Sequence, residues 1–181
     1  MNSNTLMNWT WSWVEQLLLR RAPQDDAFSR AALTASLCAY LAVDVLQALG
    51  GSAWRVAWAM TFADTLVMVL FAWAVLLLAG KSQRLVQTLT ALAGTGTLLG
   101  LPGVPLVWQA AHSQQTGGPS AAIVSGWLVL LVWTVAVEAH IFRHALSTRY
   151  GFGLMISGLH AVIDIYTLEL LFPRVLAPAG A

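Results

Sequence analysis

Five long runs of apolar residues fill the chain between Ala31 and Phe172, and no other feature constrains the fold as strongly. At a rise of about 1.5 Å per residue, each run can cross a hydrocarbon core of about 30 Å as a helix. Backbone polar groups in lipid must pair within their own segment, so helices are the suitable structure. We number these predicted spans one to five, at about residues 31–49, 54–79, 85–108, 121–142 and 152–172.

The composition also indicates that lipid surrounds most of the chain. Charged residues form 9% of it and apolar residues 58%, whereas a soluble domain has about 25% charged residues. The net charge is +1 and the basic residues are scattered, so we expect no nucleic-acid partner. Cys38 is the only cysteine, which excludes an internal disulfide and a cysteine-based zinc site.

The N-terminal segment has the character of a helix that lies in the membrane surface. Residues 5–19 carry Trp9, Trp11 and Trp13, and indole rings favour the headgroup layer. The run is too short to span, so we expect it to lie in the membrane plane; the alternative is a helix packed against the spans. Glu15 and the absence of a basic start are unlike a signal peptide, so we expect this segment to be retained.

A polar hinge, RRAPQDDAFSR, joins this helix to span one. Pro23 should end the preceding helix. Asp25 and Asp26 suit the first turn of the next helix, because the helix dipole favours negative charge there.

The basic residues predict the orientation of the chain. On one side lie Arg20, Arg21, Arg30, Lys81, Arg84, Arg143 and Arg149, and on the other only Arg55 and Arg174. The positive-inside rule therefore places the N-terminus in the cytoplasm and the C-terminus outside, with a bacterial inner membrane as the natural setting. The expected parts are an interfacial segment (1–30), an all-α bundle of five transmembrane helices (31–172) and a short periplasmic tail (173–181).

Four ionisable residues lie deep inside the spans: Asp44, Asp64, His160 and Asp164. Counting along the helices places the three acids within about 5 Å of one depth. Charges at this depth must face the bundle interior or a wet cavity. His160 and Asp164 are four residues apart and can pair on one helix face. The layer is either a proton or cation relay or a polar knot that holds the helices together.

Span three, which reads TALAGTGTLLGLPGVPL in its middle, is irregular. Gly96 and Gly100 allow a neighbouring backbone to approach closely, and we place Pro102 in the same packing site. Pro102, Gly103 and Pro105 should kink or unwind the outer half of the helix. Broken helices mark binding sites in many transporters, but packing kinks give the same pattern.

The end of span four gathers Glu138, His140, Arg143 and His144. His140 and His144 share a helix face, a spacing that can hold a metal. Two histidines are a weak metal signal, and an interfacial polar cap explains the same residues. We expect no cofactor and no nucleotide, because the chain lacks nucleotide-binding glycine loops and an evident pair of haem ligands.

The arrangement resembles the Yip (Ypt-interacting protein) family of small integral membrane proteins, including its bacterial members. The resemblance covers residues 20–172 and rests on Pro23 and Phe28 before span one, on the five close-packed spans, and on the glycine-rich LTALAGTGTLLGLPGVPL. It implies a five-helix bundle without a catalytic site, with a role in membrane organisation or as a partner of other membrane proteins.

Two functions follow as expectations. The first is a non-enzymatic accessory or scaffold protein whose partners are the bilayer and other membrane proteins or itself. The second is a small ion- or proton-coupled transporter that uses the intramembrane acids and the irregular third span.

Overall fold

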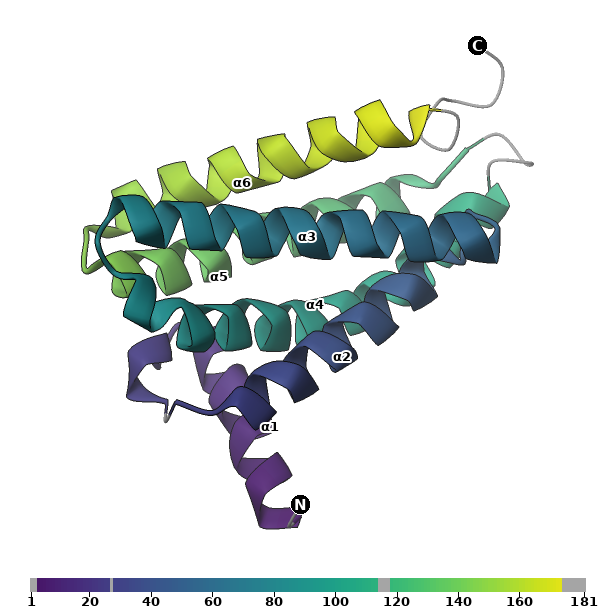
Figure 1. Ribbon diagram of the computed structural model, residues 1–181. Helices are drawn as coiled ribbons and strands as arrows, with labels where there is room; N and C mark the ends of the chain where they lie inside the picture. The colour runs from purple at the N-terminus through teal and green to yellow at the C-terminus, as the bar shows by residue number, and fades with distance from the viewer. Residues whose placement is uncertain (1–2, 27, 114–117, 174–181) are drawn as a thin grey trace.

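The computed structural model describes residues 3–26, 28–113 and 118–173, and within these ranges all regular structure is helical. Five of the described helices are long and apolar enough to cross a membrane, which indicates a multi-pass membrane protein. The long helices are α2 (Arg30–Ala48), α3 (Trp54–Leu78), α4 (Leu85–Ser113), α5 (Ala121–Leu146) and α6 (Tyr150–Leu171). Successive long helices run in opposite directions and form a bundle. The short 3-10 turns η1 (Pro23–Asp25) and η2 (Ser82–Arg84) lie at one end of it (Figure 1).

The predicted spans match these helices within a few residues, except that two helices extend further at their C-terminal ends. α4 continues to Ser113 and α5 to Leu146. The last turn of α5 contains Arg143 and His144, and basic groups suit the negative end of a helix. Arg84 also caps this end, since its Nη1 donates to the carbonyl oxygens of His144 (3.0 Å) and Ala145 (2.9 Å).

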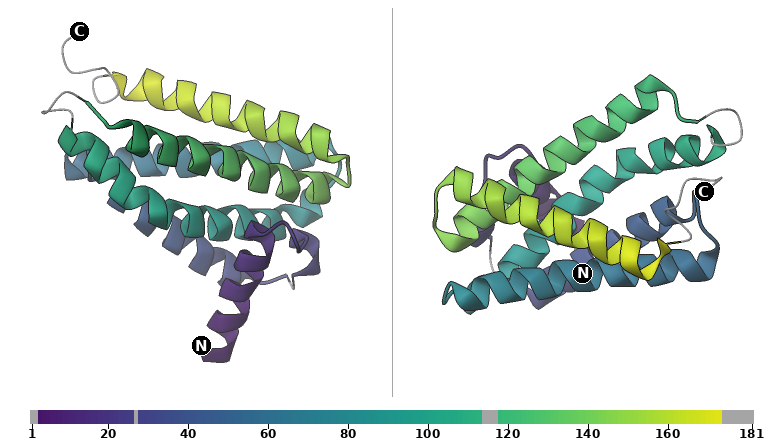
Figure 2. Two further views of the ribbon diagram at one scale, coloured as in Figure 1. Left: turned by 180° about the vertical axis from the view of Figure 1, so that it is seen from behind. Right: turned by 90° about the horizontal axis from the view of Figure 1, so that it is seen from above.

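One expectation about local structure is wrong. Asp25 and Asp26 precede α2, because Ser29 is its N-cap and accepts a hydrogen bond from the Ala32 amide (3.1 Å). Of the two outcomes expected for the outer half of span three, a kink or unwinding, the helix does not unwind, because α4 stays helical through Pro102 and Pro105. A proline removes one helical hydrogen bond, and a bend can accommodate this without ending the helix; α4 changes direction along its length in Figures 1 and 2.

The N-terminal helix α1 (Ser3–Leu17) runs across the direction of the long helices (Figure 1). One of its faces packs on the bundle, because Trp13 is buried, whereas Trp11 is 63% exposed. A helix is therefore present in the expected segment, and it packs against the spans through Trp13. That it lies in the membrane plane stays a prediction.

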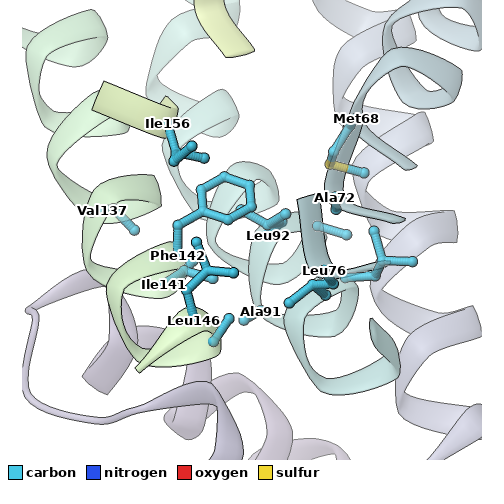
Figure 3. Packing of buried hydrophobic residues seen from close by; sticks show 13 residues of the cluster. Met68, Ala72, Leu76, Ala91, Leu92, Val137, Ile141, Phe142, Leu146 and Ile156 are labelled. Carbon is cyan, nitrogen blue, oxygen red and sulfur yellow. The ribbon is translucent and has the colours of Figure 1, made fainter. Parts of the chain in front are cut away.

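The apolar core lies toward one end of the bundle. It includes residues from four helices: Met68, Ala72, Leu76, Leu89, Ala91, Leu92, Ala93, Val137, Ile141, Phe142, Ala145, Leu146 and Ile156. These residues belong to the end of α3, the beginning of α4, the end of α5 and the beginning of α6, so they gather near the α3–α4 and α5–α6 turns. Phe142 is fully buried among them (Figure 3).

Candidate functional site

The α2–α3 hairpin brings polar side chains of two helices together. The Tyr40 hydroxyl donates a hydrogen bond to Asp64 Oδ2 at 2.6 Å. One turn further along α2, Asp44 faces Thr61 of α3. The pairs match because antiparallel helices place residues equally far from their turn at one depth, and the turn at Gly50–Ser52 lies between them.

Asp164 of α6 completes a group of three carboxyl groups. Asp64 interacts electrostatically with both Asp44 and Asp164, as expected from their common depth. Asp164 Oδ1 is buried and has no hydrogen-bond partner among the described residues. Carboxyl groups that interact in this way can share a proton when they come close enough.

His160 joins the group through a different partner from the one predicted. Its Nδ1 lies 3.0 Å from Glu138 Oε2, and the Ser157 hydroxyl donates to the same oxygen at 3.2 Å. Asp164 interacts with His160 electrostatically, but the hydrogen bond goes to Glu138 of α5. We define the polar cluster as Tyr40, Asp44, Asp64, Glu138, His160 and Asp164.

Sequence reasoning missed two members of the polar cluster, although both left a signal. Tyr40 is one helical turn before Asp44, so it lies on the same face of α2. Glu138 and His160 lie at similar distances from the turn that joins α5 to α6, at Ser147–Arg149. Residues at equal distances from the turn of a helical hairpin lie at the same depth. Comparing these distances predicts that Glu138 pairs with His160 and does not belong to the polar group at the end of α5.

Two adjoining cavities reach the polar cluster. The inner one has a volume of about 180 Å³ and is lined by Tyr40, Glu138 and His160, among others. The outer one, about 310 Å³, is lined by Asp64 and by Gly51 and Ser52 of the α2–α3 turn, so it reaches that end of the bundle. Asp44, Gln47 and Trp127 line both cavities. At about 30 Å³ per molecule, the inner cavity has room for a few waters.

The glycines of α4 lie against α2 and form one wall of the inner cavity. A Cβ at Gly96 would lie 2.8 Å from the Tyr40 ring, and one at Gly100 would lie 2.7 Å from Val43. Gly103 makes a third close approach, where a Cβ would lie 2.9 Å from Gln47 Oε1. Pro102 is exposed, so it does not take part in this contact. Because these glycines have no side chain, α2 packs closely against α4, and this places Tyr40 and Asp44 in the lining of the inner cavity.

The structure separates the residues considered as a weak metal site. Glu138 faces His160, whereas His140 Nε2 lies 3.1 Å from the Arg21 carbonyl oxygen. The His140 and His144 rings lie edge to face, with centroids 4.6 Å apart. Among the described residues, no group of three or more His, Cys, Asp or Glu side chains is arranged to hold a metal ion.

Asp26 joins the N-terminal helix to the hinge. Its carboxylate accepts hydrogen bonds from Ser12 Oγ (2.6 Å) and Gln16 Nε2 (2.6 Å) and pairs with Arg21 Nε at 2.9 Å. Arg21 also pairs with Glu15, and this hydrogen bond is the main cause of the raised pKa of the Arg21 guanidinium. Asp26 therefore links α1 to the hinge instead of occupying the first turn of α2.

Comparisons with protein-family models, with curated proteins and with solved structures found no match for this chain. The resemblance to the Yip family therefore stays a prediction. The geometry of the polar cluster and its cavities is the basis for assigning a function.

Proposed function

We propose that this chain is a small proton-coupled transporter whose polar cluster takes up and releases protons. The observation that supports it is the junction of the polar cluster with two cavities, one of which reaches the end of the bundle. Intramembrane acids that face a cavity rather than lipid are typical of proton pathways. Carboxyl, imidazole and phenol groups can each accept and donate a proton. The inner cavity, at about 180 Å³, is smaller than the roughly 300–1,000 Å³ of a typical ligand pocket, which suits protons better than a bulky solute.

Neutralising two of the acids tests this proposal. Asp64→Asn combined with Asp164→Asn should reduce proton flux to the level of protein-free vesicles, because an amide cannot carry a proton in this way. Flux is measured with a trapped pH indicator in reconstituted vesicles under a potassium diffusion potential. Glu169→Gln is the matched control, because Glu169 is exposed on the same helix as Asp164. A folded double variant with wild-type flux would reject proton coupling.

A second candidate function is that of a non-enzymatic accessory or scaffold protein. The resemblance to the Yip family also favours this function. The observation that favours it is that the same hydrogen bonds join separate helices: Tyr40 to Asp64, and Glu138 to His160. Such bonds can hold a bundle in one arrangement. If the wild-type protein shows no flux and the double variant loses its folded helix arrangement, the polar cluster is a structural feature and this candidate is preferred.

We also propose that the protein lies in a bacterial inner membrane with its N-terminus in the cytoplasm. The support is the excess of basic residues near one end of the bundle, together with the odd number of helices able to cross a membrane within the described part of the chain. Compartment-sensitive reporters fused to the two ends should report opposite sides. Two reporters active in one compartment would contradict the topology.

A further inference from the structure

The boundary between the polar cluster and the apolar core has a defined structure. Met68 and Leu92 line the inner cavity and are also members of the apolar core. Beyond them, toward the α3–α4 turn, the interior consists of tightly packed side chains such as Ala72 and Leu76, both fully buried (Figure 3). The two cavities that reach the polar cluster therefore lie on the side of the α2–α3 turn. A separate cavity of about 390 Å³ lies at the α3–α4 end and is lined by Lys81, Leu146 and Ile156, among others, and none of its lining residues belongs to the polar cluster.

Phe71 of α3 lies at this boundary, between a polar and an apolar ring. Its ring stacks on His160, with centroids 4.9 Å apart and planes at 28°. It also meets Phe142 edge to face, with centroids 5.8 Å apart. His160 is held in turn by Glu138, and Phe142 is fully buried. Phe71 is thus fixed on one side by the polar cluster and on the other by the apolar core.

We propose that Phe71, together with Phe142, seals the polar cluster from the α3–α4 end of the bundle, so that the cluster exchanges protons with the side of the α2–α3 turn only. This inference rests on the proposed proton uptake and adds its direction and its barrier. Protons move along water and polar groups, and an apolar constriction without water interrupts such a path. The structure corresponds to one state of a transport cycle, open toward the α2–α3 turn.

Removing the aromatic ring tests the seal. Phe71→Ala should raise proton flux several-fold above the wild-type rate, because water can then enter the space between His160 and the α3–α4 end of the bundle. Adding Asp64→Asn and Asp164→Asn to Phe71→Ala should return the flux to background, which shows that the leak passes through the polar cluster. Phe62→Ala is the matched control, because Phe62 lies on the same helix and is 57% exposed; it should leave the flux unchanged.

A labelling experiment in the otherwise intact protein tests the same inference without removing the ring. With Cys38→Ser as background, Thr134→Cys places a thiol in the lining of the inner cavity, and Ala72→Cys places one in the apolar core. A membrane-impermeant thiol reagent, added to vesicles of either orientation, should label Thr134→Cys from the side of the α2–α3 turn only. Ala72→Cys should not be labelled from either side.

The outcomes separate this inference from the proposed function. Labelling of Thr134→Cys from the α3–α4 side, or a folded Phe71→Ala variant with wild-type flux, would overturn the seal and leave proton coupling in place. Wild-type flux in the Asp64→Asn, Asp164→Asn variant would instead remove the proposed function, and the seal would then have no proton path to close.

Discussion

Replacing Gly153 with alanine should destabilise the protein by about 2–3 kcal/mol, the upper part of the usual range of about 1–3 kcal/mol for overpacking a closely packed site. Gly153 of α6 lies directly against the backbone of α5. A Cβ at this position would overlap the carbonyl oxygen of Ala139 and lie 3.2 Å from Arg143 Cβ. A side chain could rotate away from such a contact, but a helix backbone moves only if the two helices separate. The free energy of unfolding in mixed micelles, followed by circular dichroism, measures the loss.

Gly158→Ala provides the matched control on the same helix. No atom lies within 4 Å of a Cβ built at Gly158, and alanine is favoured over glycine in a helix by up to about 1 kcal/mol. This variant should therefore keep or slightly increase the stability. If the two variants behaved alike, the α5–α6 contact would be looser than the structure describes. Separation of α5 from α6 should also lengthen the hydrogen bond between Glu138 and His160, so the Gly153 variant should lose proton flux as well.

The five long helices follow from the sequence because length and apolar character decide them. Lipid allows few alternatives to a helix in runs such as 54–79, so local composition is sufficient. The helix ends do not follow from local composition, because α5 continues through polar residues to Leu146 and is capped by Arg84, which is distant in sequence. The position of Asp26 was also mispredicted, because its partners Ser12 and Gln16 lie on the helix before it.

The sequence predicts the common depth of the acidic residues in the candidate site, but only some of the contacts between its side chains. Helical rise alone places Asp44, Asp64 and Asp164 in one layer, and the structure brings them together. Rotation of each helix about its axis decides which side chains touch, and packing sets that rotation. Pairing of His160 with Glu138 instead of Asp164 depends on the close approach of α5 and α6 at Gly153. Cavities depend on all helices at once, which is why no local pattern in the sequence indicated them.

Trp13→Ala should release the N-terminal helix from the bundle. Trp13 is 6% exposed, and its indole packs against Gly94, where a Cβ would lie 2.5 Å from the ring. Truncating a buried aromatic side chain costs about 3–5 kcal/mol. Much of this loss of free energy should affect the docking of α1 on the bundle. The long helices should therefore stay folded in the variant. Limited proteolysis in detergent should then cut the hinge at residues 20–30 much faster than in the wild type.

The exposed Trp11 distinguishes docking from a general effect of losing an indole. Trp11→Ala removes the same side chain from a position that is 63% exposed, so hinge cleavage should stay close to the wild-type rate. Gly94→Ala should release α1 from the opposite side of the contact. Because Trp13 and Gly94 touch, the double variant should be little worse than either single variant, whereas independent sites would give additive losses. Additive losses, or equally fast cleavage in the Trp11 variant, would show that the Trp13–Gly94 contact does not hold α1 in place.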